Sequence, residues 1–345
     1  MPPTQSQKFG YADDWAIATR DKSMKTTERV LTEDLATLGE FFRSWRLKLN
    51  PNTKMAHRQL QVYADNHLLT HNTTPKYLGV TLDRTLSFKQ HLQNTAAKLR
   101  TRNNIILKLC GTTWGSNAST LRCSALGLVY STAEYCAPVW LNGAHTRLVD
   151  TQLNTTMRLI SGTIKSTPTQ WLPLLSFIPP PELRRQNALL KTFKKIQNNP
   201  NLPIQNEIAD ANRNRLRSRN PPTRTAEELR ANDFQLNNQW SNIQNEAIPA
   251  IRDMPGINTT PPGFGLPRKV WSTLNRIRTG HGNCADFRYK WDQTQSPECD
   301  CGAERQTIQH ITTECPIRRY DGDPEDFLYA TPASIEYIYN LDIKL

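Results

Sequence analysis

The stretch Lys8-Phe9-Gly10-Tyr11-Ala12-Asp13-Asp14-Trp15-Ala16-Ile17-Ala18 decides how the N-terminal part of the chain folds. Two apolar runs flank an aspartate pair and are short enough to be the buried strands of a hairpin. Asp13 and Asp14 then occupy its turn. Two adjacent ionised carboxylates repel each other unless a cation lies beside them. The pair therefore indicates either an ordinary polar turn or a site for Mg²⁺, which prefers oxygen ligands and often binds carboxylates together with substrate phosphates.

Two further motifs follow the aspartate pair in order. They are Leu47-Lys48-Leu49-Asn50-Pro51-Asn52-Thr53-Lys54 and Pro75-Lys76-Tyr77-Leu78-Gly79-Val80. Together with Phe9-Gly10-Tyr11-Ala12-Asp13-Asp14, they resemble the reverse transcriptases of non-LTR retrotransposons of the jockey type. The resemblance implies an RNA-directed DNA polymerase that acts on RNA and DNA.

The resemblance also implies a role for each motif. Asp13 and Asp14 would be catalytic and bind Mg²⁺, and Lys54 would protonate the pyrophosphate leaving group. The motif Pro75-Lys76-Tyr77-Leu78-Gly79-Val80 resembles the primer grip. Nucleic-acid contacts are therefore expected from Tyr11, Lys76, Tyr77, Leu78 and Gly79.

One departure from the family bears on activity. A reverse transcriptase palm joins three carboxylates, and the first of them lies with the fingers well upstream of the Asp-Asp hairpin. Two-metal nucleotidyl transfer needs carboxylates shared between both ions. We therefore expect a chain truncated at its N-terminus that is inactive alone and lacks the N-terminal palm and fingers of a longer protein. The alternative is a non-catalytic remnant that binds nucleic acid.

Composition favours a nucleic-acid partner. The 345 residues carry a formal charge of +12, which attracts polyanions. We find no apolar run of membrane-spanning length and no signal-peptide pattern, so we expect an intracellular protein of the nucleus or cytoplasm without a membrane partner. Without secretory signals, the seven cysteines favour thiols or metal sites over disulfides. Cys110, Cys123 and Cys136 are expected to be small buried hydrophobes, and Cys284 could be either buried or functional.

Apolar spacing predicts an α+β fold. A helix from Thr27 to Leu47 has a buried stripe formed by Leu31, Leu35, Leu38, Phe42 and Trp45. Strands within 54–62 and 68–82, separated by a turn at Asp65-Asn66, would complete a partial reverse-transcriptase palm, an antiparallel sheet with one helix. Helices from an N-cap at Ser87 to Leu109, and near 118–134, 144–161 and 182–198, resemble the thumb and its helical extension. The expected domains are 1–83 (palm), 84–200 (thumb and connection), 201–265 (flexible basic linker with short helices) and 266–345 (zinc segment and closing helix).

One stretch that ends in the expected linker is densely positive. Between Arg184 and Arg224 there are ten Lys or Arg residues and two acidic ones. Arg213, Arg215, Arg217 and Arg219 could bind nucleic-acid phosphates. The charge could equally keep a solvated linker soluble, and a nuclear-import signal is a third reading.

The C-terminal domain holds a second candidate metal site. Cys299, Cys301, His310 and Cys315 follow the pattern Cys-x-Cys-x8-His-x4-Cys. Three thiolates and one imidazole can close a tetrahedral Zn²⁺ site, so the site should be structural rather than catalytic. The alternative is four unrelated residues.

Family resemblance favours zinc, because these elements often end in a Cys-Cys-His-Cys segment associated with element RNA or target DNA. The nearby arginines are expected to face nucleic acid; they are Arg276, Arg278, Arg288, Arg318 and Arg319. A closing helix that begins at Thr331-Pro332 should dock on this segment through Ile335 and Ile338.

Overall fold

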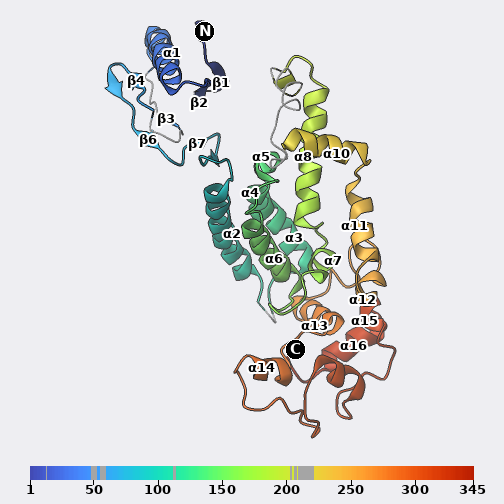
Figure 1. Ribbon diagram of the computed structural model, residues 1–345. Helices are drawn as coiled ribbons and strands as arrows, with labels where there is room; N and C mark the ends of the chain where they lie inside the picture. The colour runs from blue at the N-terminus through green and yellow to red at the C-terminus, as the bar shows by residue number, and fades with distance from the viewer. Residues whose placement is uncertain are drawn as a thin grey trace. The chain divides into compact units, whose positions relative to one another are not determined.

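The computed structural model spans the whole chain (Figure 1). It describes every residue except 13, 48–52, 55–59, 112–113, 203, 206–207 and 209–220, and for 53, 54 and 71 it describes the backbone alone. The chain forms two compact units, residues 1–94 with 143–145 and residues 95–142 with 146–345.

The first unit combines short strands with one long helix. Its elements are β1 (Gln7–Tyr11), β2 (Asp14–Ala18), α1 (Met24–Ser44), β3 (Thr53–Lys54), β4 (Tyr63–Ala64), β5 (His67–Leu68), β6 (His71–Asn72), β7 (Lys76–Tyr77) and β8 (Val80–Thr81). The described strands form four separate ladders, of which β1–β2, β4–β5 and β7–β8 are antiparallel. The β3–β6 ladder is parallel, because the intervening 55–70 segment is long enough to bring the chain back in the same direction. The predicted single antiparallel sheet is therefore wrong, although the predicted turn is present, with Asp65 and Asn66 at φ 49° and 62°.

Helix α1 confirms the body of the predicted helix but not its end. Ser23 caps it by accepting a hydrogen bond from Thr26 N–H, and Leu38 and Phe42 are buried. Trp45 was expected on the buried stripe, yet it lies past the helix end and is 68% exposed. The helix stops there because Arg46 adopts φ 58° and the backbone N–H of Leu47 turns back to Phe42 O, 2.9 Å away.

A buried carboxylate ties the start of the chain to α1. The Asp34 side chain accepts hydrogen bonds from the backbone N–H groups of Gln5 (3.0 Å) and Ser6 (2.7 Å). Asp34 is 4% exposed, so these two donors satisfy a group that would be costly to bury alone. The N-terminal segment that leads into β1 is thereby fixed against the helix.

The second unit is helical. Its elements are α2 (Lys89–Leu109, which begins in the first unit), α3 (Ala118–Ala125), η1 (Leu126–Tyr130), α4 (Ser131–Ala133), α5 (Ala137–Trp140), α6 (Arg147–Ser161), α7 (Trp171–Ser176), α8 (Pro181–Gln197), α10 (Pro222–Ala231), α11 (Leu236–Asn245), α12 (Pro249–Arg252), α13 (Arg268–Thr279), α14 (Ala285–Lys290), η2 (His310–Glu314), α15 (Asp326–Tyr329) and α16 (Pro332–Asn340). The predicted helices near 118–134, 144–161 and 182–198 are confirmed. No helix among the described residues is long and apolar enough to cross a membrane.

Helix α2 buries one stripe of its surface. Leu92, Leu99 and Ile106 are fully buried at spacings of seven residues, as expected for one face of a helix. The N-cap predicted at Ser87 is one residue too early, because the N–H of Leu92 bonds to Phe88 O and the helix begins at Lys89. Leu109 is 39% exposed and does not belong to the buried face.

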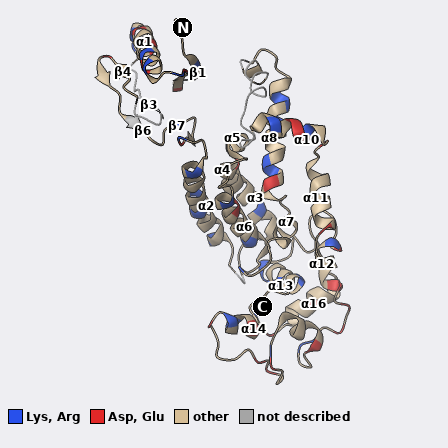
Figure 2. Ribbon diagram, in the orientation of Figure 1, with Lys and Arg blue, Asp and Glu red and all other residues tan. Residues whose placement is uncertain are grey.

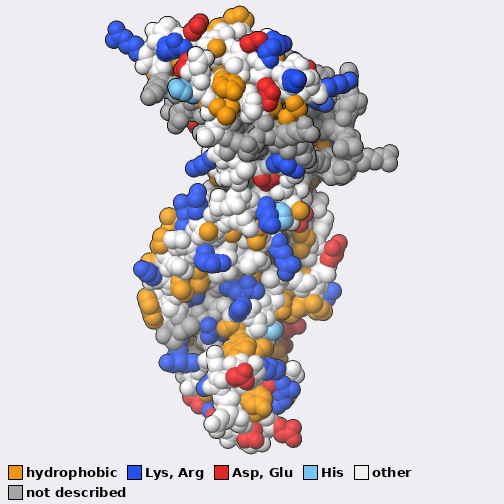
Figure 3. Space-filling model, turned by 60° about the vertical axis from the view of Figure 1, so that its left-hand side comes forward, with side chains coloured by type: hydrophobic (Ala, Val, Ile, Leu, Met, Phe, Trp, Pro, Cys, Tyr) orange, Lys and Arg blue, Asp and Glu red, His pale blue; other side chains and the backbone are white. Residues whose placement is uncertain are grey.

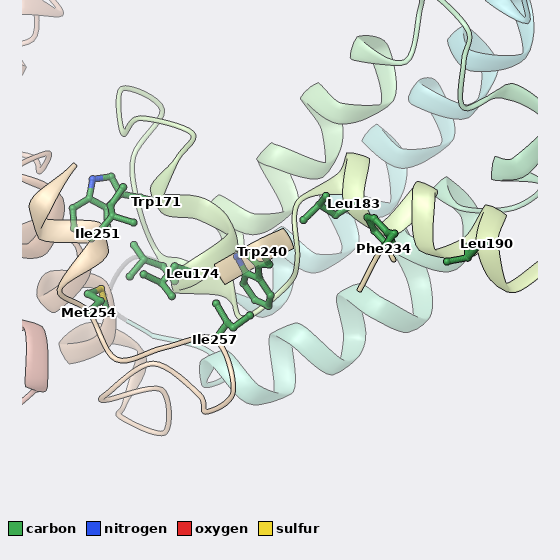
Figure 4. Close-up of a cluster of buried hydrophobic side chains, with 10 residues drawn as sticks. Trp171, Leu174, Leu183, Leu190, Phe234, Trp240, Ile251, Met254 and Ile257 are labelled. Carbon is green, nitrogen blue, oxygen red and sulfur yellow. The ribbon is translucent and has the colours of Figure 1, made fainter. Parts of the chain in front are cut away.

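The chain between α8 and α13 packs into a core (Figure 4). Trp240, Ile251 and Met254 join Trp171 and Leu174 in one cluster of buried side chains. This region falls in the expected flexible linker at 201–265. Its short helices are present, but the part after Pro222 is ordered because its apolar side chains at helical intervals find partners on α7 and α8.

The cysteines outside the C-terminal segment differ in burial. Cys110 is buried as expected, whereas Cys136 is half-buried and Cys123 is exposed. The prediction is wrong for Cys123 because its position on α3 faces solvent. Cys284 is buried, and burial raises the pKa of its thiol.

Candidate functional site

The aspartate pair lies at a β-hairpin. Strands β1 and β2 pair from Gln7 with Ala18 to Tyr11 with Asp14. Asp14 is therefore the first residue of β2 and not part of the turn, because its backbone is already paired. The connection starts at Ala12, which has φ 50°, and Asp13 lies outside the described residues. Asp14 is exposed, so its carboxylate oxygens are free to meet a cation.

The hairpin strands are less buried than predicted. Phe9, Tyr11 and Trp15 are 45%, 70% and 42% exposed. A two-stranded ladder has few neighbours to cover it, and α1 provides one of them through a ring contact of 6.1 Å between the centroids of Trp15 and Phe42. The expectation of two buried strands is wrong for this reason.

The Lys-Tyr-Leu-Gly motif forms a second hairpin beside the first. Lys76 pairs with Thr81 and Tyr77 with Val80. Leu78 and Gly79 make the turn with φ 44° and 79°, a left-handed conformation that glycine adopts freely and leucine adopts at a cost. The Tyr77 hydroxyl donates to Phe9 O at 3.4 Å. Two motifs separated by more than sixty residues in sequence are thereby joined.

Several predicted residues cannot be placed at this site. The backbone of Lys54 pairs with Asn72 in the β3–β6 ladder, but its side chain lies outside the described residues. Arg213, Arg215, Arg217 and Arg219 also lie outside them. Their roles in acid catalysis and phosphate binding stay predictions.

The four predicted zinc ligands lie together. The potential ligand atoms of Cys299, Cys301, His310 and Cys315 are all within 4.8 Å of one another. The sulfurs of Cys299 and Cys315 are 3.9 Å apart, and Cys301 Sγ is 3.2 Å from His310 Nε2. Tetrahedral zinc with Zn–S bonds of about 2.3 Å would separate two sulfurs by about 3.8 Å. The donor set and its spacing therefore fit a closed zinc site.

Local backbone geometry explains why these side chains converge. Gly302 has φ 89°, and its N–H bonds to Cys299 O at 2.9 Å, which closes a tight turn between the first two cysteines. His310 begins η2 and Cys315 follows its last residue, with the N–H of Cys315 bonded to His310 O at 2.7 Å. One short helical turn thus presents the other two ligands.

Neighbouring groups favour a thiolate at Cys299. Burial raises the pKa of this thiol, but hydrogen bonds from Cys301, Gln306 and His310 outweigh burial and lower the pKa to about 7. Arg318 lies with one guanidinium nitrogen 4.0 Å from Cys299 Sγ and is held by Asp300 and Asp342. The carboxylates fix the arginine beside the sulfur.

Two arginines upstream of the Cys/His cluster serve the fold. Arg276 and Arg278 are 8% and 7% exposed, and the prediction that they face nucleic acid is wrong. Arg276 Nε donates to Gly162 O at 3.0 Å, and Arg278 Nη2 donates to Leu328 O at 2.9 Å. Both side chains satisfy loop carbonyls, which is why α13 can be buried on most sides. Of the predicted arginines, Arg288 and Arg319 are exposed.

The closing helix α16 docks on this segment. Thr331 caps it by accepting from Ser334 N–H, Ile338 is 2% exposed and Ile335 is half-buried. The Tyr337 hydroxyl donates to Ile311 O in η2 at 3.5 Å. The predicted cap and docking are confirmed.

Helix α2 carries a basic face that the sequence analysis did not name. Its 21 residues include five basic side chains and no acidic one, and it shows blue bands without red in Figure 2. Lys98, Arg100 and Lys108 are exposed and form no ion pair with any described residue. Figure 3 shows basic side chains with few acidic ones between them over this side of the helical unit. The absence of Asp and Glu from 89–109 was the signal available in the sequence.

The chain is similar to polymerases of mobile elements. It is 33% identical over 99 residues to the RNA-directed DNA polymerase from mobile element jockey of Drosophila melanogaster, and 30% identical over 150 residues to a probable RNA-directed DNA polymerase from transposon BS of the same species. These alignments cover 27% and 41% of the chain and 11% and 16% of the relatives.

A weaker similarity extends further along the chain. Over 260 residues, 72% of its length, it is 22% identical to a retrovirus-related Pol polyprotein from the type-1 retrotransposable element R1 of Bradysia coprophila, and the alignment covers 24% of that protein. No family model matches, and no solved structure gives a significant match. The curated relatives confirm the predicted resemblance to non-LTR retrotransposon reverse transcriptases.

Proposed function

Because its curated relatives are RNA-directed DNA polymerases of non-LTR retrotransposons, we propose that the chain forms the latter part of such a polymerase: a palm hairpin, a thumb and a C-terminal zinc segment. The contact from the Tyr77 hydroxyl to Phe9 O carries the proposal, because it joins the primer-grip-like turn to the Asp-Asp hairpin. A primer end held by the primer-grip-like turn would then lie near the Asp-Asp hairpin.

The hairpin residues have separate tasks in nucleotidyl transfer. Asp13 and Asp14 are the residues that would hold Mg²⁺, which supplies activation of a 3′ hydroxyl and neutralisation of the triphosphate. Lys54 would donate a proton to the leaving pyrophosphate. Tyr11 and the Lys76–Gly79 turn would position the primer strand.

A two-metal site at Asp13 and Asp14 would need a further carboxylate. Two-metal sites share carboxylates between both ions, and the polymerases that this chain resembles supply one from an upstream strand. We therefore expect polymerase activity where such a carboxylate is provided, and none from this chain alone.

Nucleic-acid binding without chemistry is the second candidate function. The observation that favours it is the basic face of α2, where Lys98, Arg100 and Lys108 have no described ion-pair partner. These cations are spread around the solvent-exposed side of the helix, where they can bind backbone phosphates through salt-sensitive contacts. The Zn²⁺ segment would stabilise the C-terminal end of the same unit.

Primer extension on poly-rA with an oligo-dT primer and Mg²⁺ tests both functions. The chain is compared with Asp13→Ala/Asp14→Ala and with the control Asp253→Ala/Asp292→Ala, which removes two exposed carboxylates elsewhere. We expect no incorporation by any of the three, with salt-sensitive RNA binding retained. Incorporation lost only in the first variant would support the polymerase and contradict inactivity. Absence of both incorporation and RNA binding would overturn both functions.

A further inference from the structure

A cavity of about 360 Å³ lies in the helical unit, away from the zinc ligands. Its walls come mainly from α13, from the segments on both sides of α14 and from the end of the chain. The polar or aromatic lining residues are Lys269, Thr273, Arg276, Asn283, Trp291, Gln293 and Lys344. Its volume is near the lower end of the range of small-molecule sites, about 300–1,000 Å³. The cavity is therefore large enough for one small ligand.

The charged side chains at the cavity are all positive. None of its lining residues in the described part of the chain is acidic. Arg276 is 8% exposed and donates to the backbone carbonyls of Gly162 and Leu345. Lys269 and Lys344 are exposed and form no ion pair with a described residue. Arg276 is therefore already bonded within the protein, whereas the two ammonium groups without a described ion-pair partner favour an anion.

Phosphate is an anion that lysine binds as a point charge. Arg276 lies behind the two lysines and serves the fold, because its guanidinium donates to Gly162 O and Leu345 O. Burial, and then the charge of Arg268, lower the pKa of that guanidinium to about 10.

An aromatic ring adds a second kind of contact. Trp291 is 37% exposed, and its ring centroid lies 5.6 Å from that of Phe287, which supports it. The exposed amides of Asn283 and Gln293 can donate to and accept from the edge of a base. Cations for the backbone and an aromatic ring for stacking are the combination that binds single-stranded nucleic acid.

We propose that this cavity binds one unpaired nucleotide of single-stranded RNA or DNA, with its phosphate at Lys269 and Lys344 and its base stacked on Trp291. The choice of nucleic acid rests on the proposed function, whereas the preference for an anion follows from the lining residues. A duplex would not fit, because its bases are paired and stacked inside the helix. The site therefore distinguishes single strands from duplexes.

Photo-crosslinking with a 4-thiouridine-substituted U decamer tests the proposal on the full chain. The variants are Trp291→Leu, the conservative Trp291→Phe and Lys269→Gln/Lys344→Gln. Matched controls are Trp45→Leu, which removes another exposed tryptophan, and Lys191→Gln/Lys194→Gln, which removes two exposed lysines on α8. Only variants whose thermal melting matches that of the parent are scored.

We expect crosslinks to peptides that contain Trp291 or its neighbours. Loss of stacking in Trp291→Leu should weaken decamer binding at this site about 5- to 150-fold, and Trp291→Phe should restore most of it. Loss of two phosphate contacts should lower the slope of log affinity against log salt by about 1.4. The control variants should keep both the crosslink and its affinity.

Three results would overturn the proposal. One is crosslinking confined to other peptides and insensitive to Trp291→Leu. Another is equal competition by inorganic phosphate and uridine monophosphate, which would mean a simple anion site. The third is stronger displacement by an acidic peptide than by a second U decamer. These results can be told apart from a failure of the polymerase proposal, because primer extension and RNA binding to α2 do not depend on this crosslink.

Discussion

Removal of one cysteine from the Cys299/Cys301/His310/Cys315 cluster should weaken zinc binding sharply. The informative change is Cys315→Ser, because Cys315 is fully buried and its sulfur lies 3.9 Å from that of Cys299. Serine has nearly the same shape but is a poor ligand for zinc. The matched control is Cys284→Ser, which replaces a cysteine that is also buried but lies outside the cluster.

The spacing of the ligand atoms sets the expected magnitude. The observed 3.9 Å between sulfurs is within about 0.1 Å of the tetrahedral value, so little binding energy is spent on rearrangement. Structural zinc contributes an apparent free energy of about 10–16 kcal/mol, and an equal share for each of four ligands is about 2.5–4 kcal/mol. The dissociation constant for zinc should therefore rise about 70- to 900-fold in Cys315→Ser.

Competition with a chromophoric chelator measures that constant, and thermal melting with and without chelator measures the linked stability. The parent should bind one zinc ion and melt earlier when the ion is removed. Cys284→Ser should bind zinc like the parent. A parent that binds no zinc, or equal losses in the two serine variants, would refute the closed-site reasoning.

Three further predictions concern stability. Gly162→Ala should lower the free energy of unfolding by about 3 kcal/mol, because the residue has φ 73° and the new methyl group would lie 2.2 Å from Ser272 Oγ. The control Gly280→Ala, at φ 66° with open space around it, should lower it by about 1 kcal/mol. Equal losses of the two variants in chemical denaturation would contradict this. Asp34→Ala should lower the free energy of unfolding by about 3 kcal/mol, because two backbone donors of the first unit lose their acceptor. A loss below about 0.5 kcal/mol would show that water replaces the carboxylate. Burial raises the pKa of Asp286, but hydrogen bonds from Lys290 and Arg305 lower that pKa below its ordinary value. The carboxylate should therefore stabilise the folded state above about pH 4, and this contribution should be lost as the pH falls through the lowered pKa of the folded state. Denaturation measured across that range should be less pH-dependent in Asp286→Asn, and an unchanged profile would exclude this carboxylate as the cause.

Local patterns predicted much of the fold because they depend on neighbouring residues. The bodies of α1, α2, α6 and α8 follow from apolar spacing, and the turn at Asp65-Asn66 follows from residues that tolerate positive φ. Thr331 as a cap is equally local. The end of α1 was missed because Arg46, rather than glycine, adopts the left-handed conformation there.

Features that depend on distant partners were predicted poorly. Arg276 and Arg278 were predicted to face nucleic acid, yet their guanidinium groups donate to backbone oxygens whose positions the sequence does not reveal. The buried acceptor Asp34 was missed for the same reason, since its donors lie 28 and 29 residues away. The part of the expected linker after Pro222 is ordered by contacts with α7 and α8.

The sequence by itself determined the resemblance to retrotransposon polymerases, the helical segments and the four candidate zinc ligands, because motifs and periodicity are carried by short stretches of chain. Tertiary structure alone decided that the described strands form separate ladders, that Tyr77 reaches Phe9 and that two lysines lie at a cavity beside Trp291. The physical reason is the same in each case. Burial, carbonyl partners and cavities exist only after segments far apart in sequence have packed together.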